Sequence, residues 1–157
     1  VFMGEVGRGS CETQSIKPGI AGEDMATVML RHAGGTVSLV DCTYEARRDP
    51  DPFPETLLEI EGRRGSLVLS PGLQLKLTSD GRTATRDLAT PLLSWTSHPW
   101  HVAQESVLNT QRHWVESLRT GREPATSGAD NLKTYALVMA AYDAAREHQA
   151  IVPRAWP

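Results

Sequence analysis

Hydrophobic residues alternate with polar residues in short runs over the first half of the chain. Such alternation predicts β-strands, because successive side chains of a strand point to opposite faces of a sheet. The strongest runs cover residues 25–30, 36–44, 56–61, 66–70 and 73–78, a weaker run lies near 83–88, and another lies near 1–6. Because short turns join most of the runs, we expect about five to six strands in a largely antiparallel sheet.

Glycine marks the turns between these runs. Gly34 and Gly35 predict a tight hairpin, and similar turns are expected at residues 62–65 and 79–81. Residues 47–54 differ, because three prolines within five residues exclude both a helix and a central strand there. The sequence therefore predicts a sheet of hairpins that is interrupted by one proline-rich loop.

The second half has hydrophobic residues three and four positions apart, which is the period of an α-helix. One predicted helix follows Pro99 and ends at Gly121, and a second runs from Ser127 to about His148. We expect Ser127 to cap the second helix, with Asp130 reaching back as in a capping box. The predicted buried faces are Val107, Leu108, Gln111, Trp114, Val115 and Leu118 in the first helix, and Leu132, Tyr135, Val138, Met139 and Tyr142 in the second.

A run of strands followed by a run of helices indicates an α+β fold, with the two long C-terminal helices packed on one face of an open-faced sheet. We expect one domain over residues 1–157, with strands over about 1–88 and helices over about 99–148. The strands hold more apolar side chains than one covered face needs, which favours a homo-oligomer that buries the open face; a loosely packed monomer is the alternative. These side chains are Met25, Val37, Leu39, Leu67, Leu69, Leu73, Leu75 and Leu77.

Composition narrows the class of protein. The 157 residues are 39% hydrophobic and 22% charged, as in ordinary globular chains, and the formal net charge of −3 offers no basic excess for nucleic acid. No apolar run approaches the roughly 18 residues of a membrane-spanning helix. Cys11 and Cys42 have no metal-ligand spacing and predict two reduced thiols. We therefore expect a cytoplasmic protein that binds no metal, membrane or nucleic acid.

The densest cluster of polar and aromatic residues lies where the first predicted helix begins. It contains His98, Trp100, His101 and Gln104, and Arg112 follows on the same side of the helix. Two histidines and a tryptophan at a helix entrance suit a polyhydroxylated ligand, which needs stacking and several hydrogen bonds. In the alternative interpretation, the tryptophans anchor the helix to the sheet while the histidines cap it or face solvent.

A second cluster lies where the strand over 36–44 passes into the proline-rich loop. Tyr44 and Arg47 stand at this strand end, where binding groups are often found, and could reach a ligand. The alternative is a surface loop with charged side chains. The sequence has no G-x-G-x-x-G, P-loop, G-x-S-x-G, C-x-x-C or H-E-x-x-H motif. A self-contained hydrolase built on Cys42 or on the histidines is a weaker alternative.

From Glu23 to Val152, an ordered set of short segments resembles the C-terminal domain of the Gfo/Idh/MocA oxidoreductases. The resemblance implies an N-terminal Rossmann domain that binds NAD or NADP, and a C-terminal α+β domain that closes the substrate pocket and forms oligomers through its sheet. The segments are Glu23-Asp24, Gly34-Gly35, EGRRGSL (61–67), WVESLRTGREP (114–124), Ser127-Gly128, Asn131-Leu132 and AAYDAA (140–145).

The family's catalytic lysine lies in a Glu-Lys-Pro motif of its nucleotide domain, and its catalytic Asp and His precede the region matched here. In this chain Lys17-Pro18 follows Ile16 rather than glutamate. The resemblance therefore implies a detached C-terminal domain, inactive alone, with no catalytic or cofactor-binding residue of its own and with the Rossmann domain as its partner.

On this interpretation the parent enzyme is an NAD(P)-dependent dehydrogenase of a sugar, inositol or related polyol. The residues expected to orient the hydroxyls of this small-molecule substrate are Tyr44, Arg47, His98, His101, Gln104 and Arg112. The alternative is a stand-alone, non-catalytic module for dimerisation or small-ligand binding.

Overall fold

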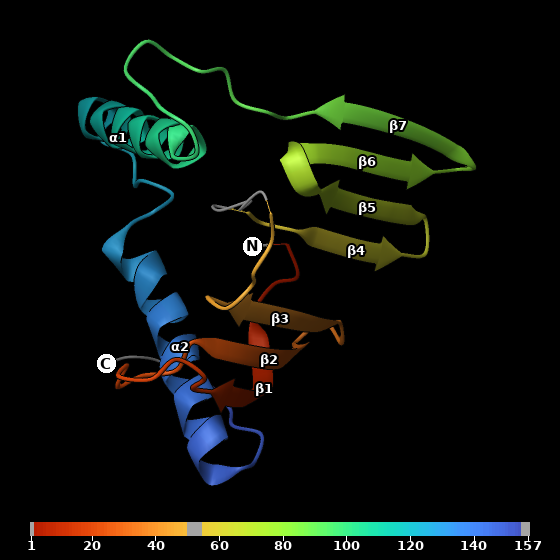
Figure 1. The fold of residues 1–157 in the computed structure, drawn as a ribbon, viewed down its shortest axis with the longest axis vertical. Helices are drawn as coiled ribbons and strands as arrows, with labels where there is room; N and C mark the ends of the chain where they lie inside the picture. Colours follow the sequence, from red (N-terminus) through yellow and green to blue (C-terminus); the bar gives the residue numbers. More distant parts are fainter. Residues whose placement is uncertain (1, 50–54, 155–157) are drawn as a thin grey trace. The chain divides into compact units, whose positions relative to one another are not determined.

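The structure is a computed structural model that describes residues 2–49 and 55–154 (Figure 1). Its chain divides into two units. The first joins Val1–Ala46 to Ala125–Pro157, and the second is Arg47–Pro124. Most of the proline-rich loop predicted from the sequence, residues 50–54, lies outside the described residues.

A three-stranded antiparallel sheet forms the β-structure of the first unit. Its strands are β1 (Val6–Gln14), β2 (Met25–His32) and β3 (Val37–Thr43), in the order β1-β2-β3. The predicted hairpin between β2 and β3 is confirmed: the Gly35 N–H donates to the His32 carbonyl oxygen at 2.9 Å, and Gly35 has a φ of 87°. Glycine tolerates this left-handed conformation because it has no Cβ.

The strand expected near residues 1–6 lies further along the chain, at β1. Gly7 and Gly9 lower the strand preference of this segment, so its pattern did not predict a strand. Gly9 lies close to Leu30, because a Cβ at position 9 would approach the Leu30 Cδ2 atom to 2.9 Å and the leucine side chain would have to shift. Gly9 and Ile151 also exchange two backbone hydrogen bonds, of 2.9 and 2.8 Å, which attach the C-terminal segment to this edge strand.

Helix α2 (Gly128–Glu147) packs against β1 and completes the first unit. As predicted, the Ser127 side chain caps this helix by accepting a hydrogen bond from the Asp130 N–H at 3.2 Å. The predicted buried face of α2 is wrong, because its large residues, such as Tyr135 and Val138, are exposed. Alanines of α2 face the core instead, because their small side chains let the helix approach the sheet closely. The buried hydrophobic residues of the described chain are Cys11, Leu30, Ala136, Ala140 and Ala144.

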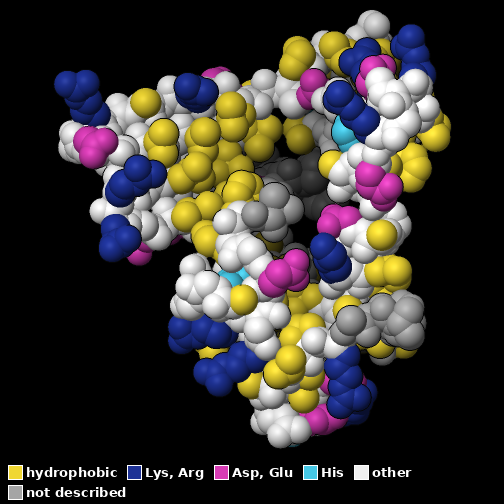
Figure 2. Space-filling view, turned by 180° about the vertical axis from the view of Figure 1, so that it is seen from behind, with side chains coloured by type: hydrophobic (Ala, Val, Ile, Leu, Met, Phe, Trp, Pro, Cys, Tyr) yellow, Lys and Arg dark blue, Asp and Glu magenta, His cyan; other side chains and the backbone are white. Residues whose placement is uncertain are grey.

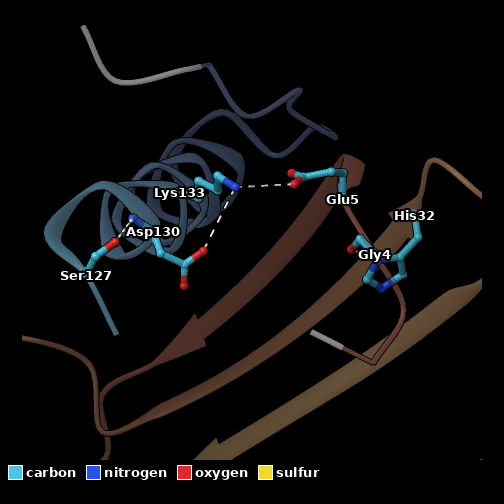
Figure 3. A network of polar contacts seen from close by, with 6 residues as sticks. All are labelled: Gly4, Glu5, His32, Ser127, Asp130 and Lys133. Carbon is cyan, nitrogen blue, oxygen red and sulfur yellow. Dashed lines mark hydrogen bonds and ion pairs between the residues drawn. The ribbon is translucent and has the colours of Figure 1, made fainter. Parts of the chain in front are cut away.

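The N-terminal segment is held to the first unit mainly by a buried histidine (Figure 3). His32 Nδ1 lies 2.9 Å from the Gly4 carbonyl oxygen, and its Nε2 lies 2.8 Å from the Ser38 hydroxyl. The Lys133 ammonium adds an exposed ion pair with Glu5 at 3.8 Å. Both ring nitrogens of His32 therefore have partners inside the unit.

The second unit contains a four-stranded antiparallel sheet, in the order β4-β5-β6-β7. Gly62 lies opposite Gly65 across the predicted turn between its first two strands. The mostly antiparallel α+β fold is confirmed, and the described residues form seven strands in two sheets where about five to six in one sheet were expected. The strands are β4 (Leu58–Gly62), β5 (Gly65–Ser70), β6 (Gln74–Ser79) and β7 (Arg82–Asp87), and a short 3-10 turn, η1 (Pro71–Leu73), joins β5 to β6.

One face of the four-stranded sheet is apolar. The register pairs Leu67 with Leu77 and Leu69 with Leu75, so these side chains share a face. Leu58 and Ile60 of β4 lie on the same face. Figure 2 shows hydrophobic side chains gathered over this sheet. The opposite face is mostly polar, with Glu59, Glu61, Lys76, Thr78, Thr83 and Thr85 beside Val68, and on β7 the apolar face continues into Ala84 and Arg86.

Helix α1 (His101–Thr120) belongs to the second unit. It ends as predicted: Gly121 adopts a left-handed conformation with a φ of 67°, and its N–H donates to the Ser117 carbonyl oxygen. The predicted buried face is wrong here too, because Val107, Val115 and Leu118 are exposed and Ser117 is the buried residue of α1. Among the described residues, no helix is both long enough and apolar enough to cross a membrane.

Candidate functional site

The start of α1 brings three of the predicted site residues together. The His98 and His101 rings meet edge to face, with their centroids 4.2 Å apart and their planes at 66°. The Gln104 Oε1 atom accepts a hydrogen bond from the Ser97 N–H at 3.0 Å. This bond ties the segment before the helix to the first turn of the helix, so the histidine pair lies in a locally ordered entrance.

The chain leading into this entrance is ordered by a second small turn. The Leu93 N–H donates to the Thr96 Oγ1 atom at 2.8 Å, and the Thr96 N–H donates to the Leu93 carbonyl oxygen at 3.0 Å. Side-chain hydroxyls commonly stabilise turns in this way. Trp100, half exposed between the two histidines, adds an aromatic surface beside them.

Three buried polar atoms of the second unit have no hydrogen-bond partner within the described part of the chain. They are His101 Nδ1, Glu55 Oε1 and Thr90 Oγ1. Because buried polar atoms are nearly always hydrogen-bonded, such exceptions mark places where a ligand, a water molecule or another polypeptide completes the site. Sequence reasoning selected His101 but missed Glu55 and Thr90, since no local motif signals an unpartnered atom.

Of the two residues that sequence reasoning missed, Glu55 has its side chain held by an ion pair. Its Oε2 atom accepts a hydrogen bond from Arg48 Nη1 at 2.6 Å, while Oε1 stays buried and unpartnered among the described residues. The ion pair orients the carboxylate, so one of its oxygens is fixed in place as a potential acceptor.

The other predicted site residues lie elsewhere. Arg112 is exposed on α1, eleven residues after His101, which corresponds to about 16 Å along a helix axis. Arg47 is exposed at the start of the second unit, whereas Tyr44 follows β3 in the first unit and is 86% exposed. The entrance of α1 therefore gathers His98, His101 and Gln104.

The titratable groups of the first unit serve its structure. Asp24 is buried and accepts hydrogen bonds from the backbone N–H groups of Lys17 and Ile16, which hold the pKa of Asp24 below its usual value. Burial raises the pKa of the Cys11 thiol, which keeps this thiol protonated and unreactive. A hydrogen bond from the Tyr142 hydroxyl to Glu23 lowers the pKa of Glu23 and raises that of Tyr142.

The described residues do not fit a metal ion or a nicotinamide nucleotide. No group of three or more histidine, cysteine, aspartate or glutamate side chains within residues 2–49 and 55–154 could hold a metal ion. Both described sheets are antiparallel, whereas a dinucleotide site needs a parallel βαβ unit with a glycine-rich loop before its helix. The described sheets therefore contain no βαβ unit of the kind that binds a dinucleotide.

Sequence comparison finds two curated relatives. The chain is 45% identical over 150 residues to the D-apiose dehydrogenase of Rhizobium rhizogenes. The aligned region covers 96% of this chain and 44% of that protein. It is also 47% identical over 150 residues to the D-apiose dehydrogenase of Paraburkholderia graminis, and this alignment covers 96% of this chain and 40% of that protein. The chain thus spans less than half the length of either relative. No family model matches it.

Structure comparison agrees. The fold matches the crystal structure of an oxidoreductase from Agrobacterium radiobacter in complex with NAD+, L-tartaric acid and magnesium. The TM-score is 0.92 at 45% sequence identity, and the match covers 96% of this chain and 44% of that one. The chain is therefore similar, over nearly its whole length, to part of a larger NAD+-binding oxidoreductase.

Proposed function

We propose that residues 1–157 form one C-terminal substrate-binding and oligomerisation domain of an NAD(P)-dependent dehydrogenase of the Gfo/Idh/MocA family. The observation that carries the proposal is the TM-score of 0.92, at 45% identity, with part of an oxidoreductase that binds NAD+. The proposal also agrees with the antiparallel sheets of the described residues, which lack the βαβ unit of a nucleotide site. An N-terminal Rossmann domain of the parent enzyme would hold the cofactor.

The substrate we propose is D-apiose or a closely related neutral sugar. Two relatives of 45% and 47% identity are named D-apiose dehydrogenase, and their similarity extends over 96% of this chain. The reaction class is oxidation of a CH–OH group. In this chain the histidine pair and Gln104 would orient the sugar hydroxyls, and Trp100 would pack against the apolar C–H surface of the ring. Tyr44, Arg47 and Arg112 stay candidate substrate-binding residues on the sequence pattern alone.

The oligomer we propose is formed by a second copy of the chain on the apolar face of β4–β7. On this face Leu58, Ile60, Leu67, Leu69 and Leu75 are half-buried and Leu77 is 48% exposed, while β7 adds Ala84 and Arg86. A contiguous apolar sheet face in contact with water is costly, and a two-fold interface buries the same patch on both subunits.

Steady-state kinetics of the parent enzyme test this function. We expect turnover of D-apiose with NAD+ or NADP+, and an increased KM or decreased kcat/KM for the sugar in His101→Ala and Gln104→Ala. His113→Ala, which removes an exposed histidine further along α1, is the matched control. Unchanged kinetics of both variants with every sugar that the enzyme turns over would refute the assignment of the site.

Reading the gene upstream of residue 1 separates this function from a stand-alone binding module. About 120 codons that encode a strand, a G-x-G-x-x-G loop and a Glu-Lys-Pro motif would support the dehydrogenase. A start codon at Met3 would instead support the module.

A further inference from the structure

The two ring nitrogens of His101 lie in different surroundings. Nδ1 is buried and has no hydrogen-bond partner among the described residues. Nε2 has no such partner either, and it is not among the buried unpartnered atoms, so it is not fully buried. No ion pair joins this ring to a carboxylate within residues 2–49 and 55–154. The protein therefore contacts neither nitrogen through a polar group, and only Nε2 is accessible to a ligand.

This difference decides where the proton of the neutral ring lies. A proton on Nδ1 would bury an N–H donor without an acceptor, which native structures rarely tolerate. A proton on Nε2 leaves only a lone pair buried and presents the N–H to solvent.

The surroundings of His101 also fix the direction of its Nε2 atom. The His98 ring packs against it edge to face at 4.2 Å, and His101 stands in the first turn of α1. The Gln104 Oε1 bond to the Ser97 N–H holds the segment that carries His98. These contacts restrict rotation of both rings, so the exposed nitrogen is presented in one orientation.

We propose that His101 is held as the neutral Nε2–H tautomer, and that this N–H donates a hydrogen bond to an oxygen atom of the bound sugar. The donor role rests on the proposed function, whereas the tautomer follows from the geometry of the ring alone. A neutral donor of this kind suits a hydroxyl, ring or carbonyl oxygen of an uncharged sugar. In this arrangement Gln104 also positions Ser97, through the hydrogen bond that its Oε1 atom accepts.

Nitrogen NMR of the histidine rings tests the tautomer directly. Long-range proton–nitrogen correlation spectra of the chain with 15N-labelled histidine distinguish Nε2–H, Nδ1–H and imidazolium rings. The sequence has five histidines, and the signals missing from His101→Gln assign this one. We expect the Nε2–H pattern at neutral pH. An Nδ1–H pattern, an imidazolium pattern or an even mixture of tautomers would overturn the proposal.

Two amide substitutions in the parent enzyme test the donor role. The side-chain nitrogen of glutamine reaches the position of Nε2, whereas that of asparagine reaches the position of Nδ1. We expect His101→Gln to keep the KM for the sugar within about threefold and His101→Asn to raise it about tenfold. Equal effects of the two variants would overturn the donor role. A parent enzyme without sugar turnover would refute the proposed function and leave the NMR result on the tautomer standing.

Discussion

The two units of the chain differ in how completely each satisfies its own buried groups. In the described residues, every buried hydrophobic side chain lies in the first unit, and its buried Asp24, His32 and Ser127 all have hydrogen-bond partners. The second unit buries Ser117, exposes an apolar sheet face and holds all three unpartnered buried atoms. Both units expose large hydrophobic side chains, so within the described residues the two units differ mainly in the unpartnered buried polar atoms, which all lie in the second.

The unpartnered buried polar atoms support the proposed site more strongly than the types of residue present do. Titratable groups occur in both units, but the buried Asp24 and His32 of the first unit have hydrogen-bond partners within that unit. Polar groups that are buried and unpartnered are costly, and they persist where a ligand or another polypeptide completes them. The entrance of α1 meets this criterion and also carries the histidine pair.

The largest expected effect comes from a charge on the apolar face of the second unit. If the proposed oligomer forms through this face, we expect Leu77→Lys to give a monomer, because a lysine buried in the interface would be desolvated without a partner. Light scattering of the folded variant measures the mass. Thr83→Lys places the same charge on the polar face of the sheet and should leave the oligomer intact. An unchanged mass for Leu77→Lys would show that this face is not the interface.

A bulky residue in the core tests the first unit next. Ala144 is 1% exposed in α2, so Ala144→Leu overpacks the core and should lower the free energy of unfolding by about 2 kcal/mol. Chemical denaturation measures the change. Ala129→Leu makes the same substitution at an exposed position of the same helix and should change stability by less than about 0.5 kcal/mol. Equal effects would argue against a tight contact of α2 with β1.

The buried carboxylate of the first unit predicts a smaller effect that depends on pH. Because hydrogen bonds hold the pKa of Asp24 below its ordinary value of 3.8, the carboxylate stabilises the fold above that pH. This stabilisation is lost as the pH falls through the lower pKa of the folded state. We expect Asp24→Asn to lower the Tm by a few degrees near neutral pH, and the difference from the unmodified chain to shrink in acid.

Thermal unfolding as a function of pH measures this effect. Asp41→Asn serves as the control, because Asp41 is an exposed aspartate of the same sheet that bonds to the Thr27 hydroxyl. A difference between Asp24→Asn and the unmodified chain that stays constant into acid would show that the hydrogen bonds do not depend on ionisation.

The smallest effect is expected for the exposed ion pair of the first unit. Lys133→Met removes the contact with Glu5, and since both side chains are mostly exposed, stability should change by less than about 0.5 kcal/mol. Denaturation with and without added salt measures the change. A loss several times larger would show that this pair, rather than the contact of His32 with Gly4, holds the N-terminal segment.

Particular residues show what the sequence could predict of the fold. The turns at Gly35 and Gly62–Gly65 and the Ser127 cap follow from local chemistry, so pattern reasoning placed them correctly. Strand β1 was not predicted over its observed bounds, because glycine is uncommon in strands and the segment contains Gly7 and Gly9. The close approach of the Leu30 side chain to Gly9 is a tertiary contact that the sequence pattern does not encode. In both helices the spacing of large apolar residues was clear, but which face is buried depends on tertiary packing.

The candidate site was predictable in part. His98, His101 and Gln104 were selected because histidine and amide side chains gather at one helix start, and the structure places them there together. Whether the Gln104 side chain points toward a ligand or toward Ser97 depends on the backbone geometry before α1, which the spacing of residues along the sequence does not predict. The unpartnered atoms of Glu55 and Thr90 depend on burial by residues distant in sequence.

The central claim is that this chain supplies sugar recognition and oligomerisation but no nucleotide site. A fluorescence titration of NADH and NADPH against the chain, with light scattering on the same sample, tests it most directly. The account predicts a folded oligomer without saturable nucleotide binding. Saturable binding in the micromolar range would place a cofactor site within these residues and contradict the account.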